Sequence, residues 1–142
     1  MGKSYGTLCK SCGNEEEYML GFGFMSNPSF EYLNESIKSK VIKRHLHVLE
    51  KNYKGMIVDV PSLELFKCPT CKTLHSRLQF KVYYSNDKIF EPQYSCGKCK
   101  SILIPIELTG NYMGEDSEPI GYNCKKCGKE TLERSLSSIL WD

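Results

Sequence analysis

The sequence predicts a mainly β fold that is stabilised by metal, and two observations support this prediction. All eight cysteines lie in four Cys-x-x-Cys pairs, and none is left over. Four thiolates in a tetrahedron are the usual ligands of a structural zinc ion, so eight suit two Zn²⁺ ions. The segments around the pairs mostly show the polar and apolar alternation of half-buried strands. We therefore expect a small protein built from two zinc-stabilised β units, the first of which carries an inserted helix.

The first Cys-x-x-Cys pair, Cys9 and Cys12, is followed by Gly13. Glycine suits a tight turn after the second cysteine because it adopts positive φ without a steric penalty. Residues 18–25 are largely apolar and contain two glycines, which predicts a strand that another backbone approaches closely. The first unit thus begins with a metal-binding turn that leads into a strand.

Residues 28–51 predict an amphipathic helix. Asn27 suits its N-cap, Pro28 its first position, and Gly55 ends the pattern. The residues expected on its buried side recur every three or four positions and are Phe30, Leu33, Ile37, Val41, His45 and Val48. Beside them lies a group that we call the basic stripe, within an arc of about 100°. The basic stripe consists of Lys40, Lys43, Arg44, His47 and Lys51.

After the helix the sequence returns to strand patterns. Pro61 limits ladder pairing in the first of these segments, and residues 85–88 supply a turn between two others. The tail fits either a helix or a strand, and we favour a strand. The expected strands are residues 56–61, 63–66, 77–84, 89–94, 101–108, 120–123 and 132–142.

Each site must combine two cysteine pairs, because one Cys-x-x-Cys turn presents only two ligands. We favour sequential pairing, since short loops close at a low entropic cost. Site 1 would then consist of Cys9, Cys12, Cys68 and Cys71, and site 2 of Cys96, Cys99, Cys124 and Cys127. An alternative stays open: residues 72–95 number 24, like residues 100–123, so the two central pairs could combine and leave the terminal pairs to meet. Sequential pairing divides the chain into residues 1–85 and 86–142, as two domains or one continuous unit.

Two of the cysteine motifs resemble the knuckles of the zinc-ribbon superfamily. They are Cys68-Pro69-Thr70-Cys71 and Cys124-Lys125-Lys126-Cys127-Gly128. The layout, with Gly21-Phe22-Gly23-Phe24 and a terminal Trp141-Asp142, resembles small bacterial proteins described only as hypothetical zinc-ribbon proteins. The resemblance implies two zinc ribbons, an antiparallel β fold and all eight cysteines as ligands. It implies no activity, because ribbons serve transcription factors, ribosomal proteins, polymerase subunits and enzyme accessory domains.

The composition favours a cytoplasmic protein. The first residues lack the apolar run of a signal peptide, and no segment is long and apolar enough to suggest a membrane span. In a reducing compartment, cysteines serve as metal ligands more often than as disulfides. Two zinc ions bound by eight thiolates would change the formal charge from +2 to about −2, so a generally basic nucleic-acid binder is not indicated. The lysines beside the cysteines are expected to compensate the thiolate charge.

No local motif predicts catalysis, since the three histidines form no His-Glu-x-x-His helix and no small-molecule substrate is evident. His75 could replace a cysteine as a metal ligand. Because eight cysteines already complete two sites, we expect His75 to lie on a strand surface instead. We interpret the protein as a non-enzymatic scaffold that binds nucleic acid or an acidic protein through the basic stripe. Alternatives are an ordinary solvated helix face at the stripe, a pure protein-interaction adaptor, and a metal-handling or redox protein.

Overall fold

The computed structural model describes residues 2–22, 28–85, 87–106, 119 and 121–135. The strands are β1 (Gly2–Cys9), β2 (Glu15–Gly21), β3 (Ile57–Val58), β4 (Ser62–Lys67), β5 (Leu74–Gln79), β6 (Val82–Ser85), β7 (Lys88–Phe90), β8 (Ile104–Pro105) and β9 (Leu132–Arg134). The helices are α1 (Phe30–Ser36) and α2 (Lys40–Asn52). The mainly β prediction is confirmed.

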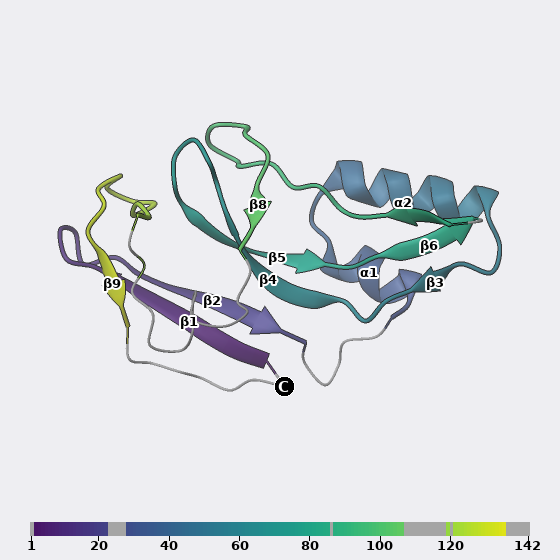
Figure 1. The fold of residues 1–142 in the computed structure, drawn as a ribbon, viewed down its shortest axis with the longest axis horizontal. Coiled ribbons are helices and arrows are strands. Elements are labelled where there is room, and N and C mark those ends of the chain that lie inside the picture. The colour runs from purple at the N-terminus through teal and green to yellow at the C-terminus, as the bar shows by residue number, and fades with distance from the viewer. Residues whose placement is uncertain (1, 23–27, 86, 107–118, 120, 136–142) are drawn as a thin grey trace.

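The strands form two antiparallel sheets. The larger has the order β5-β4-β2-β1-β9, with β8 paired to β4, and the smaller has the order β3-β6-β7. β1 and β2 form a long hairpin around the first cysteine pair, and β9 returns from the C-terminal region to pair with β1. Figure 1 shows β1, β2 and β9 at one end of the molecule and the helices at the other, beside β3 and β6.

The strand boundaries differ from those predicted. β1 was not predicted, residues 77–84 divide between β5 and β6, and only two residues of 101–106 form a strand. Residues 121–123 form none, although a strand was predicted there. The preference for a strand in the tail is confirmed at β9, while residues 136–142 lie outside the described part, as do residues 23–25, 107–108 and 120 of the predicted strands.

The prediction of one continuous helix over residues 28–51 is wrong, because the segment forms two helices. The chain becomes extended at Ile37 (φ −87°, ψ 128°), so α1 ends there. The Ser29 side chain accepts a hydrogen bond from the Tyr32 N–H, and the Ser39 side chain accepts one from the Ile42 N–H. These serines cap the two helices, because a hydroxyl oxygen satisfies an N–H that has no partner in the first turn. The predicted cap, Asn27, lies outside the described residues.

The break also changes which side of the helical segment is buried. Leu33 and Ile37 are buried as predicted, but in α2 the buried residues are Ile42 and Leu46. Val41 is 61% exposed and Val48 47% exposed, and His45 is exposed as well, so their predicted burial is wrong. The predicted periodicity assumed that each residue turns the helix by about 100° without interruption. The extended residues between α1 and α2 break this rotation, so the buried side of α2 cannot be counted from that of α1.

β4 contributes side chains to two apolar cores. Phe66 belongs to the first core, with the buried helix residues, Leu78, Phe80 and Val82. Leu65 belongs to the second core, which also contains Tyr5, Tyr18, Leu20 and Leu74.

Two ladders, β1–β9 and β4–β8, cross the boundary predicted between residues 85 and 86. The division into domains at that boundary stays a prediction. Within the described residues, neither helix has the length and apolar character needed to cross a membrane.

Candidate metal centres

The eight cysteine side chains gather in two groups of four. The terminal site consists of Cys9, Cys12, Cys124 and Cys127, and the central site of Cys68, Cys71, Cys96 and Cys99. In each group every sulfur lies within 4.8 Å of the others. One cysteine of each pair is buried (Cys9, Cys68, Cys96 and Cys124), and its partner is more exposed.

This grouping corrects the sequential pairing. The predicted site 1 (Cys9, Cys12, Cys68, Cys71) and site 2 (Cys96, Cys99, Cys124, Cys127) are not formed, and the alternative is the one that the structure adopts. The two central pairs come together although β5, β6 and β7 lie between them in the chain. The terminal pairs come together although that whole segment and both central pairs lie between them.

The physical reason lies in the sheet. β9 pairs with β1 so that Leu132 faces Cys9 and Glu133 faces Leu8, which brings the last cysteine pair beside the first. The longer loop costs only about 1 kcal/mol more to close, because closure entropy rises with the logarithm of length. A few ladder hydrogen bonds, each worth about 1 kcal/mol, offset that cost. The prediction weighed loop length but did not include this ladder.

The sulfur geometry fits a tetrahedral metal ion. Zinc with four sulfurs at about 2.3 Å requires sulfur–sulfur separations of about 3.8 Å. In the terminal site, the Cys9–Cys127 and Cys12–Cys124 separations are 3.5 and 3.6 Å. In the central site, Cys71 Sγ lies 3.7 Å from Cys96 Sγ and 3.9 Å from Cys99 Sγ, and the Cys68–Cys99 separation is shorter, 3.0 Å. Both sites therefore have the donor set of a four-thiolate centre, and four of these five separations are close to the tetrahedral value.

All four cysteine pairs adopt the same turn. The N–H one residue after the second cysteine donates to the carbonyl of the first cysteine at 2.9 Å, and the first cysteine's N–H donates to the carbonyl five residues on. The residue after the second cysteine has positive φ in every case: Gly13, Lys72, Lys100 and Gly128. The glycine predicted for this turn is thus present in the terminal site, whereas the central site places lysines in a conformation that favours glycine.

Hydroxyl groups lie close to one sulfur of each site. Thr131 Oγ1 is 3.0 Å from Cys9 Sγ, and Thr73 Oγ1 is 3.2 Å from Cys71 Sγ. Such groups stabilise thiolates by hydrogen bonding, as outer-shell partners of metal ligands commonly do. We did not predict them from the sequence, although Thr73 and Ser101 occupy the same place, two residues after the second cysteine of their pairs.

The thiols differ in how readily they ionise. The Thr131 hydroxyl holds the pKa of Cys9 at about 6, and the neighbouring Cys68 thiol, with Ser101, does the same for Cys99. Burial raises the pKa of Cys68 to about 11. A divalent cation would shift all of these toward ionisation, since metal ligation deprotonates cysteine.

His75 is buried, not on a strand surface as predicted. Its Nε2 lies 2.8 Å from Thr73 Oγ1, so a hydrogen-bonded row runs from His75 through Thr73 to Cys71. Burial, with Lys125 and Arg77 nearby, lowers the pKa of His75 to about 4, which keeps the ring neutral at pH 7. His75 belongs to neither group of four cysteines.

The two sites are joined by the segment before Cys124. The Asn123 N–H donates to the Lys72 carbonyl at 2.8 Å, and its side-chain amide donates to the Cys71 carbonyl at 3.1 Å. Lys125, inside the last pair, lies 5.0 Å above the Tyr18 ring. Burial lowers the pKa of Lys125, and Glu16 acts in the opposite direction, as do the Cys96 and Cys71 thiolates to a smaller extent. This lysine of the terminal site therefore lies where it favours negative charge at the central site.

The basic stripe lies apart from the sulfur groups, on α2. Lys40, Arg44, His47 and Lys51 are exposed, and Lys43 is half-buried. Glu50 is the one acidic residue of α2. The structure thus brings the stripe together as a helix face, as predicted.

Comparison of the chain with protein families, with curated proteins and with solved structures finds no match.

Proposed function

We propose that each group of four cysteines holds one structural zinc ion and that the protein is a non-enzymatic scaffold. The observation that carries this proposal is the repeated turn: four Cys-x-x-Cys units of the same backbone geometry converge in twos on four-sulfur sites. The zinc would cross-link segments far apart in the chain, which a small protein with two modest apolar cores needs. Four protein ligands leave no open position for a substrate, which argues against catalysis or metal transfer.

Metal analysis of the purified protein tests this proposal. We expect about two zinc ions per chain, bound through sulfur, and unfolding after removal by a strong chelator. The control is the same chelator saturated with excess zinc, which should leave the protein folded. A metal-free protein that stays folded would contradict a structural role, and loss of zinc to weak chelators without unfolding would favour metal handling.

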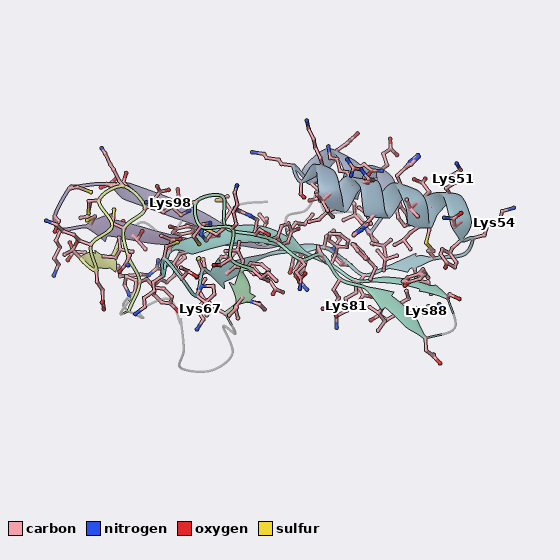
Figure 2. The ribbon with its side chains drawn as sticks, turned by 90° about the horizontal axis from the view of Figure 1, so that it is seen from above. Lys51, Lys54, Lys67, Lys81, Lys88 and Lys98 are labelled. Atoms are coloured by element: carbon pink, nitrogen blue, oxygen red, sulfur yellow. The ribbon has the colours of Figure 1, made fainter. Side chains whose placement is uncertain are left out.

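We further propose that the scaffold presents the basic stripe to nucleic acid. Four of the five stripe residues are exposed, and no ion pair in the described part of the chain engages any of the five. Cations without acidic partners can neutralise phosphates and release counterions, so binding should weaken steeply with salt. Figure 2 shows Lys51 at the end of α2 and Lys88 on the opposite side of the molecule, which offers a matched control.

Binding of labelled oligonucleotides over a range of salt concentrations tests the stripe. Replacing Lys40, Arg44 and Lys51 with glutamine should lower the slope of log affinity against log salt by about 2 to 3. Lys88→Gln should leave the slope nearly unchanged. Equal effects of the stripe variant and the control would contradict this role.

An exposed apolar row supports a second candidate, a protein-interaction adaptor. Tyr83 pairs with Ile57 on one side and Ile89 on the other, so the three side chains are neighbours on one face of the smaller sheet. All three are exposed. A protein partner bound there should resist high salt and be lost on Tyr83→Ser, whereas the triple glutamine variant of the stripe should retain it.

A further inference from the structure

A recess of about 700 Å³ opens where the two helices meet β4 and β5. This volume lies within the usual range of ligand-binding pockets, about 300 to 1,000 Å³. Its apolar lining comes from Ile37, Leu63, Leu78 and Tyr94. Three of these side chains are nearly buried and belong to the first core, so the floor of the recess is held by packing. Such a surface can receive a flat, weakly polar group.

The rim of the recess is cationic. Lys38 and Arg77 line it, together with neutral polar residues such as Ser39 and Gln93, and the lining contains no carboxylate. Lys38 is exposed and Arg77 is half-buried. The Arg77 guanidinium donates through Nη1 to the Ser76 carbonyl, and it lies near enough to the Tyr94 hydroxyl to oppose the rise that burial causes in the pKa of that group. Two cations and several apolar side chains thus line the same recess.

The recess joins the basic stripe at the start of α2. Ser39 and Val41 line the recess, and Lys40, the first stripe residue, lies between them in the chain. From Lys40 to Lys51 the helix rises about 16 Å, enough to lie along several phosphates of one strand. A polyanion lying along the stripe would thus bring its end to the recess.

We infer that the recess receives an unpaired nucleotide, so that the protein prefers single-stranded nucleic acid to duplex. This inference rests on the nucleic-acid binding proposed above. The apolar floor suits the face of a base, the neutral polar groups suit its edge, and Lys38 and Arg77 suit the adjoining phosphate. A duplex keeps its bases stacked and paired, so it can contact the stripe but cannot fill the recess. The chemistry is shared by RNA and DNA, and both probes belong in the experiment.

The experiment measures the affinity of the zinc-loaded full chain for fluorescent oligo(dT), oligo(U) and a mixed-sequence DNA duplex. We expect single strands to bind about tenfold or more tightly than the duplex. Lys38→Gln and Arg77→Gln should each weaken single-strand binding about three- to tenfold and change duplex binding little. Lys40→Gln should weaken single-strand and duplex binding to the same extent. Lys88→Gln should weaken neither kind of binding. Lys38 is exposed outside both helices, so its variant tests the recess even if Arg77→Gln reduces stability.

Several results would overturn the inference. Equal or tighter binding of the duplex would do so, as would Lys38 and Arg77 variants that behave like the Lys88 control. In both cases the proposed role of the stripe would stand. No binding of any oligonucleotide at low salt would overturn the proposed nucleic-acid role and the recess inference together, and binding of an acidic peptide alone would assign the surface to a protein partner.

Discussion

The Asn123 side-chain amide donates a 3.1 Å hydrogen bond to the carbonyl of Cys71 and so links the two cysteine sites. Asn123 directly precedes a cysteine of the terminal site, and Cys71 belongs to the central site. With the second bond, from the Asn123 N–H to the Lys72 carbonyl, the last cysteine pair rests on the turn of the central site. The terminal site is thus positioned by the central one as well as by the β1–β9 ladder.

Replacing Asn123 with alanine should therefore weaken the terminal site first. The change removes the side-chain bond and keeps all eight sulfurs, at a cost of about 1 kcal/mol in the free energy of unfolding. We expect one of two zinc ions to leave faster when chelator is added, as followed by native mass spectrometry. Asn52→Ala, at the exposed end of α2, is the control and should change neither rate. Equal acceleration of both ions would contradict the positioning of one site by the other.

The positive φ after the last cysteine pair predicts a second effect. Gly128 has φ +74°, and a Cβ built there meets nothing within 4 Å, so only backbone strain opposes a side chain. Gly128→Ala should cost about 1 kcal/mol in unfolding free energy, measured by urea denaturation of the zinc-loaded protein. Gly97 also has open space but no positive φ in that range, so Gly97→Ala should cost much less. Equal costs would contradict the turn geometry.

The break between the helices predicts which apolar residues of α2 stabilise the core. Leu46 is 0% exposed, whereas Val48 is 47% exposed. Leu46→Ala should lower the free energy of unfolding by about 2 to 5 kcal/mol, because it leaves a cavity. Val48→Ala should change it by less than about 0.5 kcal/mol. A continuous helix with the predicted buried side would give the reverse order, and denaturation curves of the two variants distinguish these cases.

The parts of the structure that depend on local chemistry could be predicted from the sequence. The cysteine spacing indicated the four turns and the two sites, and alternation indicated β4 and the β6–β7 hairpin. The helix region and its basic stripe were also evident. The break at Ile37 could not be read from periodicity, because extended backbone there depends on packing and on the capping of a new helix by Ser39.

The pairing of the cysteines depended on an interaction between distant segments. The sequences of β1 and β9 lack a distinctive strand pattern. Their ladder pairs Thr7 with Arg134, which are far apart in the chain. Loop entropy alone favoured the wrong pairing by about 1 kcal/mol. A few hydrogen bonds are enough to reverse that preference. Thr131 and Asn123 likewise reach the sites only through the contacts that this pairing creates, whereas Thr73 lies two residues after Cys71 and contacts it locally.

The double variant Cys9→Ser/Cys124→Ser tests the proposed arrangement of the two metal sites most directly. In the structure both changes fall in the terminal site, so the central site keeps its four sulfurs. We expect the variant to bind about one cobalt ion with the absorption spectrum of a four-sulfur tetrahedral site. Sequential pairing would remove one sulfur from each site. Two cobalt ions with three sulfur ligands each, or no four-sulfur spectrum at all, would contradict the account.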